Sequence, residues 1–376
     1  MAEADSQSSA RRPAHPLAPR PRPPESVELI DSAESIRAEW DKLADRIEAA
    51  PFLRPGWIEP WQEAFCSGEP AYLVTRRDGA LAGVLPLQRR RGTLVSTANW
   101  HTPLYGPVAA DGEAASELAC GLLAHAGSRA DLWFLDPEAP GYPQIARAAE
   151  AGGYGTIART IAQSPYIAVE GSFEDFMAGL DRKFRKDIGR RWRRLEEQGG
   201  AEAVFEDGSD GLEDLLTDAF RLEGSGWKSE QGSAIASDPK RERFYRQVAR
   251  WAADRGWLRL AFLRVGGRAI AFDFGIEAHG VFYIPKGGFD VEYRKAGPGQ
   301  LLTHAGIERA FELGLRSYEL LGQQDEYKRQ WTSSVRERLR LQAFPRRPVG
   351  SANYIAWRYG RTLVRKVRRQ GRADPF

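Results

Sequence analysis

The stretch that decides the fold is YRKAGPGQLL, residues 293–302, in which Arg294 is followed by Gly297 and Gly299. A strand-forming run precedes it and a leucine-rich helical pattern follows it. Glycines let the backbone approach an anion closely, and the first turn of a helix offers free N–H groups. Pro298 suits the first helical position, because proline gives up an N–H that would be free there. Gly-Pro-Gly also fits an ordinary turn, so the neighbouring elements must decide between a turn and a phosphate site.

The second half of the chain shows a regular order of elements around this stretch. The spacing of apolar residues predicts helices at 176–195, 212–222 and 244–251, strands at 258–265, 268–277 and 281–286, a helix through 302–313, a strand at 317–321, a helix from 326 and a strand at 338–344. The glycine pair 266–267 turns the hairpin between the first two strands. The glycine motif therefore lies between a strand and a helix, which favours the phosphate site.

The first half repeats this order with little identity of residues. It shows a helix that begins near Ser32 and runs to about 47, a hairpin of strands 71–76 and 81–87 turned by Asp78-Gly79, a helix at 114–125, a strand at 131–135, a helix at 142–151 and strand-like sequence ending near 169. We infer two α/β domains of one type, residues 26–170 and 171–347, joined near Gly171.

Composition limits the class of protein. The 376 residues are 42% hydrophobic and 28% charged with a net charge of +3, as in a soluble globular protein of two domains. No apolar run approaches the roughly 20 residues of a membrane span. Residues 1–25 are predicted to be a disordered, proline-rich leader, and 348–376 a basic tail. Two cysteines predict no disulfide scaffold, and the scattered histidines predict no metal site. We expect a cytoplasmic protein.

The motif and its setting resemble the pyrophosphate loop of the GNAT acyltransferase superfamily. More closely, the chain is similar to the tandem-GNAT group, which includes cellulose-biosynthesis-type acetyltransferases and Fem-type peptidyl transferases. The segments that carry the resemblance are LDRKFRKDIGRRWRRLE, GWK, FYIPKGGFD, GPGQLL and LLGQQDEYKRQW. In FYIPKGGFD the pattern departs from a bulkier Lys-x-Gly-Tyr-Asp, which leaves the role of Phe289 open.

The resemblance implies a fold and a donor. Each half is expected to be a GNAT-like domain with a mixed, mostly antiparallel sheet flanked by helices. Acetyl-CoA or another acyl-CoA would be the co-substrate, without a metal. Its diphosphate would be held by Arg294, Gly297, Pro298, Gly299 and Gln300. The matching place in the first half reads YGPVAADGEAAS and lacks the arginine and paired glycines, so that domain is expected to bind no CoA.

The resemblance also suggests residues for the chemistry. Tyr327 occupies the place of the tyrosine that protonates the leaving thiolate in many GNAT enzymes; alternatively, it only packs its helix. Glu223 and Asp325 are candidate bases, against the simpler interpretation that they are surface carboxylates. Asp273 and Glu319 lie on strands and could face solvent or the cleft. Four residues are candidates for substrate binding: Trp227, Lys228, Lys286 and Lys328. The alternatives are that they pack in the core, cover a sheet edge or are solvent-exposed without a function. The loops 224–238 and 100–107 are expected to shape the acceptor pocket.

Two basic segments suggest anionic partners. Residues 182–194 hold eight lysines or arginines on a helix whose apolar stripe is regular, so the basic face points outward. Nucleic acid, acidic lipid and polyanionic saccharide are candidates, although DNA is not predicted. In the tail, apolar residues recur at every fourth position, which suits an amphipathic helix on the inner membrane. The alternatives are that the tail docks on the protein itself or is disordered.

These patterns lead to one main functional hypothesis and two alternatives. The main one is an N-acetyltransferase-type enzyme that moves an acyl group from acyl-CoA to an amine or hydroxyl of a small-molecule or saccharide acceptor, in envelope or exopolysaccharide metabolism. The first alternative is a Fem-like transferase that uses aminoacyl-tRNA as donor. The second is a non-catalytic accessory protein of polysaccharide biosynthesis, because a fold does not establish an activity.

Overall fold

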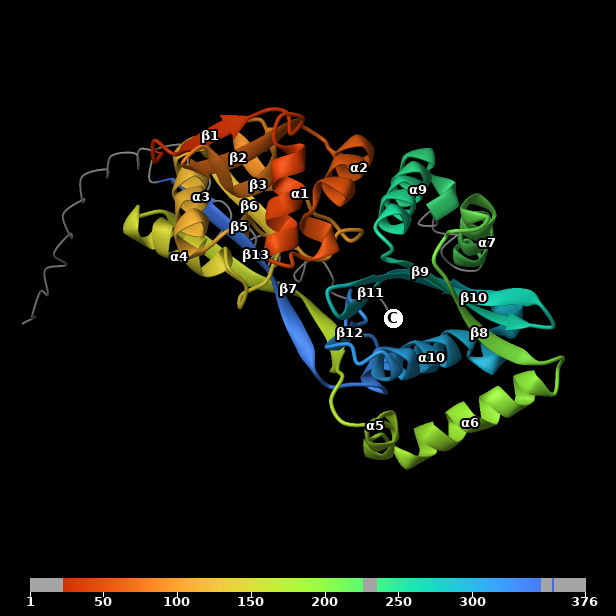
Figure 1. Ribbon diagram of the computed structural model, residues 1–376. Coiled ribbons are helices and arrows are strands. Elements are labelled where there is room, and N and C mark those ends of the chain that lie inside the picture. Colours follow the sequence, from red (N-terminus) through yellow and green to blue (C-terminus); the bar gives the residue numbers. More distant parts are fainter. Residues whose placement is uncertain (1–22, 226–234, 346–353, 355–376) are drawn as a thin grey trace, which may run out of the picture.

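The computed structural model describes residues 23–225, 235–345 and 354 (Figure 1). The first half forms β1 (Val27–Ile30), α1 (Arg37–Arg46), α2 (Pro55–Phe65), β2 (Glu69–Arg77), β3 (Ala80–Arg90), β4 (Thr93–Ser96), β5 (Val108–Ala109), α3 (Gly112–His125), β6 (Arg129–Leu135), α4 (Tyr142–Ala151) and β7 (Gly155–Ala168). The second half forms α5 (Phe173–Gly179), α6 (Arg182–Glu196), β8 (Ala201–Glu206), α7 (Leu212–Glu223), α9 (Pro239–Asp254), β9 (Leu258–Val265), β10 (Arg268–Ala278), β11 (Val281–Phe289), α10 (Pro298–Glu312), β12 (Ser317–Glu319), α11 (Glu326–Arg329) and β13 (Val335–Phe344).

The strands join into one continuous sheet that runs through both halves. The order is β1-β2-β3-β4-β6-β13-β7-β12-β11-β10-β9-β8, with β5 beside β3. Most neighbours are antiparallel, whereas β4–β6 and β11–β12 are parallel. The sheet is mixed and mostly antiparallel with helices on both faces, which confirms the predicted fold class. Each half contains one parallel pair, which fits the predicted repeat of architecture.

Strand β13 crosses from the second half into the sheet of the first. It lies between β6 and β7, and Figure 1 shows β7 and β13 as long paired strands that link the two halves. Arg340 on β13 makes two hydrogen bonds to the buried carboxylate of Asp131 on β6, at 2.8 and 2.7 Å. Bidentate arginine–carboxylate pairs are among the stronger hydrogen bonds, and removing one partner of a buried pair is strongly destabilising. The position of β13 between β6 and β7 ties the two halves together. The domain bounds remain a prediction.

The helices and the sheet enclose three apolar cores. Buried residues of α3 and α4 cover one face of the first half. Residues of α6 and α10 cover one face of the second half. The third core is shared, because α1 and α2 of the first half and α7 and α9 of the second bury their apolar faces in the same cluster. The α10 side and the α7–α9 side of the second half are therefore opposite faces of one sheet (Figure 1).

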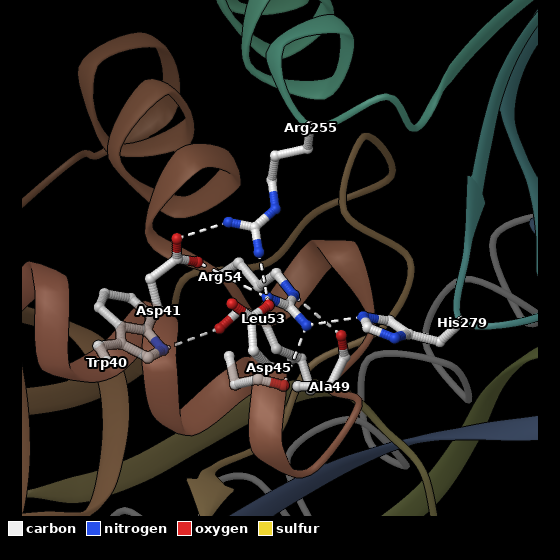
Figure 2. Close-up of polar contacts among 9 residues, drawn as sticks. Trp40, Asp41, Asp45, Ala49, Leu53, Arg54, Arg255 and His279 are labelled. Carbon is white, nitrogen blue, oxygen red and sulfur yellow. Dashed lines mark hydrogen bonds and ion pairs between the residues drawn. The ribbon is translucent and has the colours of Figure 1, made fainter.

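A polar cluster around Arg54 links the halves (Figure 2). The buried guanidinium donates to the carbonyls of Ala44 at 2.9 Å and Ala49 at 3.0 Å, and its Nη2 lies 2.8 Å from His279 Nε2 in the second half. Asp45 accepts from Arg54 and also from Arg255, at the end of α9. The cluster holds the first two helices against the second half by charge as well as by packing.

The structure corrects two helix predictions. The helix predicted from about Ser32 begins only at Arg37. Residues 176–195 were predicted as one helix but form α5 and α6, because Asp181 accepts a hydrogen bond from the Phe184 N–H and starts a new helix. The pattern also missed the short strands β1, β4, β5 and β8 and the helix α2. No helix within the described residues is long and apolar enough to cross a bilayer. The predicted leader up to residue 22, and the predicted tail apart from Tyr354, lie outside the described residues.

Candidate functional site

The site forms where two parallel strands part. β11 and β12 pair only from Val281–Ser317 to Tyr283–Glu319, after which β12 ends and β11 continues to Phe289. A cavity of about 590 Å³ occupies this place. Eleven of the candidate residues from the sequence line it: Glu223, Asp273, Lys286, Arg294, Gly297, Pro298, Gly299, Gln300, Asp325, Tyr327 and Lys328. Two further candidates, Trp227 and Lys228, lie outside the described residues.

The glycine motif forms the start of α10. A 3-10 turn, Val291–Ala296, leads to Gly297, whose φ of 63° lies in the left-handed region that favours glycine. Pro298 is the first residue of α10, as predicted, and no side chain caps the helix. A Cβ on Gly299 would meet only Phe289, at 3.8 Å. The fold therefore requires glycine at 297 but not at 299, where the missing side chain leaves the cavity open.

Gln300 and Lys328 fix the segments on either side of the cavity. The Gln300 amide donates to Gln330 Oε1 at 2.8 Å and to the Tyr327 carbonyl at 3.3 Å, which joins α10 to α11. Lys328 is buried, and its ammonium donates to the carbonyls of Leu321 at 2.7 Å and Gln323 at 3.2 Å. The alternative of a solvated lysine is wrong, because Lys328 holds the loop between β12 and α11.

Tyr327 lies at the cavity, and the residue is 47% exposed. Desolvation of the hydroxyl, followed by the negative charges of Asp273 and Asp325, raises the pKa of Tyr327 above its usual value. An ordinary tyrosine is already protonated at neutral pH, so the direction of this shift only strengthens its hold on the proton. The hydroxyl therefore carries its proton at neutral pH, and the raised pKa makes it a weaker acid than an ordinary tyrosine.

Side chains from both faces of the sheet line the cavity. Asp273 pairs with Gly287 and Phe274 with Lys286, and directly paired residues in antiparallel strands point to the same face. Phe274 belongs to the α7–α9 core, so Lys286 lies on that side and Asp273 on the α10 side. The gap between the strands therefore brings residues of the two faces to one cavity.

Glu223 and Lys286 form an ion pair on the α7–α9 side. Lys286 Nζ lies 3.3 Å from Glu223 Oε1, and Glu223 Oε2 accepts from the Ile235 N–H at 2.6 Å. The Glu223 side chain is fully buried, which rules out the interpretation of a surface carboxylate. Asp325, by contrast, is exposed at the start of α11. Glu223 is thus the better placed of the two predicted bases.

Close packing of β11 explains the KGG sequence. A Cβ on Gly288 would lie 2.7 Å from the Glu223 Cα, and one on Gly287 would overlap Asp273 Oδ1. The two glycines therefore let β11 pass close to α7 and to β10. Phe289, whose role the sequence left open, packs beside Gly299 and lines the cavity. Glu319, also considered from the sequence, is paired with Arg336 at 3.0 Å and does not line the cavity.

The first half contributes Trp100 and Pro103 to the cavity, from the loop that the sequence predicted for the acceptor pocket. Trp100 is 55% exposed, and its indole meets Phe134 edge-on. The next residue, His101, stacks on Phe65 at 5.0 Å, and its Nδ1 lies 2.9 Å from the Tyr245 hydroxyl. Sequence reasoning also missed Thr303, which lines the cavity and donates to the Gly299 carbonyl at 2.9 Å, although its i,i+4 spacing from Gly299 was visible.

His101 should make stability fall in mild acid. Desolvation, then the charges of Lys286 and Arg241, lower the pKa of His101 to about 3. The unfolded chain takes up this proton below about pH 6.5, so the free energy of unfolding drops as pH falls from there toward 3. We expect His101→Phe to remove up to about 2 kcal/mol of the decrease between pH 7 and pH 5, measured by urea titration at both pH values. An unchanged decrease in the variant would contradict this assignment.

Comparison with known proteins supports the domain type. Residues 182–329 match the family model of the acetyltransferase (GNAT) domain. No curated protein is similar enough in sequence to count as a match. The fold resembles the C-terminal domain of a putative lysylphosphatidylglycerol synthetase from Agrobacterium fabrum, at 12% identity and a TM-score of 0.55, over 88% of this chain and 97% of that one.

Two further solved structures share the fold. FemX is similar at 11% identity and a TM-score of 0.55, over 84% of this chain and 96% of that one. L-PGS from Bacillus licheniformis is similar at 11% identity and a TM-score of 0.52, over 91% of this chain and 97% of that one. At these identities the likeness concerns the fold, and it extends over both halves of the chain.

Proposed function

Because residues 182–329 match the family model of the acetyltransferase (GNAT) domain, we propose that this chain moves an acyl group from acyl-CoA to an amine or hydroxyl acceptor. The observation that carries the proposal is the single cavity in the gap between β11 and β12. The start of α10 lines this cavity together with a tyrosine, and a buried carboxylate lines it from the opposite face. This arrangement suits a reaction between two substrates that arrive from different sides.

In the proposed reaction, the chain supplies binding groups and two proton carriers. The N-terminus of α10 and Arg294 would stabilise the diphosphate of the donor. The acceptor nitrogen or oxygen forms a bond to the thioester carbon, and the carbon–sulfur bond breaks. The acceptor proton passes to Glu223, directly or through water, and Tyr327 donates a proton to the leaving sulfur. Lys286, beside Glu223, would orient the acceptor.

Direct binding of the donor tests the proposal. Calorimetry with acetyl-CoA and longer acyl-CoAs should give saturable heat in the micromolar-to-millimolar range, and a structure with CoA should place the diphosphate at residues 297–300. Absence of binding with every acyl-CoA would refute the assignment of the donor. Binding without turnover on any amine or hydroxyl acceptor would instead favour the non-catalytic accessory role.

Tyr327→Phe should slow the chemical step. A thiol has a pKa near 8.5, so its thiolate is a weak base and leaves with little help from an acid. The rate gain from general acid catalysis by Tyr327 should therefore lie at the low end of its usual range. We therefore expect kcat to fall about 100-fold with little change in the acyl-CoA dissociation constant. Lys328→Gln is not a suitable control, because Lys328 holds its loop. Glu326→Gln, an exposed neighbour on α11, should leave kcat unchanged. Full activity of Tyr327→Phe would reduce the tyrosine to a packing role.

The basic helix α6 favours the Fem-like alternative as a second candidate. A transferase that takes its donor from aminoacyl-tRNA needs a cationic surface near the reaction site, and binding of this kind weakens steeply with salt. A gel-shift titration with tRNA at 50 mM and 200 mM salt tests it. The acceptor class, the place in envelope or exopolysaccharide metabolism, and the cytoplasmic or membrane-peripheral location remain proposals that rest on the family resemblance.

A further inference from the structure

A second cavity lies beside the first and is strongly cationic. A groove of about 1420 Å³ runs along α6. Five of its lining residues are basic: Arg182, Lys183, Lys186, Arg190 and Arg193. Its two acidic residues are already engaged, since Asp181 caps the helix and Asp187 pairs with Arg190 and Arg191. Lys183 and Lys186 are exposed and make no ion pair with the described residues. The groove is therefore suited to an anionic ligand.

Two contacts join this groove to the phosphate loop. Gln330 lines the groove and is hydrogen-bonded to Gln300, which lines the donor cavity. On the other side, the Arg191 guanidinium occupies the space that a Cβ on Gly297 would need, so a side chain there would clash with Nη1. Arg191 is held in place by Asp187, to which its Nε donates at 2.6 Å. Cationic side chains of α6 therefore extend from the groove to Gly297, where the diphosphate is proposed to bind.

The shape of an acyl-CoA decides which part of it reaches the groove. With the thioester near Tyr327 and the diphosphate at the start of α10, the remaining part is the 3′-phosphorylated adenosine, which must leave the cavity past residues 297–300. α6 lies there, packed against α10, with Trp192 and His304 in ring contact at 6.2 Å. The 3′-phosphate carries negative charge, and the groove presents the matching charge.

We propose that the α6 groove binds the 3′-phosphoadenosine end of the donor, and that Lys183 and Lys186 make the protein select CoA over dephospho-CoA. This inference rests on the proposed function, because it assumes that acyl-CoA is the donor. Arg191 acts as a positioning residue that supports the loop at Gly297. Exposed charge pairs in water contribute little singly, so selectivity depends on several cations around one phosphate.

Calorimetry with CoA and dephospho-CoA at 50 mM salt tests the inference on the full chain. We expect CoA to bind the wild type at least about tenfold more tightly than dephospho-CoA, the equivalent of about one charge-assisted contact. The double variant Lys183→Gln, Lys186→Gln should lose this preference through weaker binding of CoA, with the affinity for dephospho-CoA unchanged. Arg194→Gln removes an exposed charge from the same helix outside the groove and should keep the preference.

Each other result has a definite meaning. Equal affinity of the wild type for the two ligands overturns the inference and leaves the proposed function intact. No binding of either ligand overturns both. If CoA selectivity survives in the double variant while salt-dependent binding of tRNA is lost, the groove serves RNA and the inference is wrong.

Discussion

Gly299→Glu is expected to weaken acyl-CoA binding by more than about 100-fold while the protein stays folded. The side chain would enter the cavity at the start of α10 and place a carboxylate where the diphosphate is proposed to bind. Like charges brought together in a binding site cost several kcal/mol, which corresponds to such a loss. The fold should tolerate the change, because a Cβ at this position meets only Phe289 at an ordinary 3.8 Å and the backbone is not left-handed. Calorimetry measures the affinity, and thermal unfolding checks the fold.

A matched control separates the site from a general effect of the mutation. Gly179, at the end of α5, is exposed, has no atom within 4 Å of an added Cβ, and does not line the donor cavity. Gly179→Glu adds the same charge and volume and should leave acyl-CoA affinity unchanged. If Gly299→Glu and the wild type bind acyl-CoA equally well, the diphosphate does not bind at this loop. In that case the motif is the ordinary turn that the sequence also allowed.

Arg54→Ala is expected to lower the free energy of unfolding by about 3–5 kcal/mol. The substitution leaves the carbonyls of Ala44 and Ala49 without a donor in a buried place, and each loss of this kind costs about 1–3 kcal/mol. It also removes a fully buried side chain that stacks on Trp257, with Cζ 4.8 Å from the ring centroid. The ion pair itself contributes little to this sum, because the Asp45 side chain is half exposed and water screens its charge.

Urea unfolding of the wild type, Arg54→Ala and Arg37→Ala measures this effect. Arg37 pairs with Glu59 at 3.1 Å, but its side chain is 61% exposed, so its removal should cost less than about 1 kcal/mol. Because Arg54 lies between the halves, the variant could also separate their unfolding into two transitions (Figure 2). Similar losses in the two variants would mean that the buried cluster does not stabilise the association of the halves.

The candidate site residues could be predicted because short sequence patterns mark them. Gly297 and Gly299 stand between a strand and a helix, and Pro298 begins that helix as its position in the motif indicated. The roles of single side chains were harder to predict. Lys328 looked like a solvated lysine but is buried against two carbonyls, since the loop between β12 and α11 folds back over it. The break between α5 and α6 was missed because the apolar stripe continues through it while Asp181 caps the second helix.

The sequence by itself predicted the order of most longer elements, the repeat of the two halves and the phosphate-loop candidate. Each of these follows from residues close together along the chain: apolar periodicity, turn glycines and a proline at a helix start. The tertiary structure alone decided that β11 and β12 part beside this loop, that Glu223 meets Lys286, and that Arg191 of α6 fills the space over Gly297. It also placed β13 in the sheet of the first half. These contacts join residues far apart in sequence, so they depend on strand register and on helix packing, which no local pattern contains.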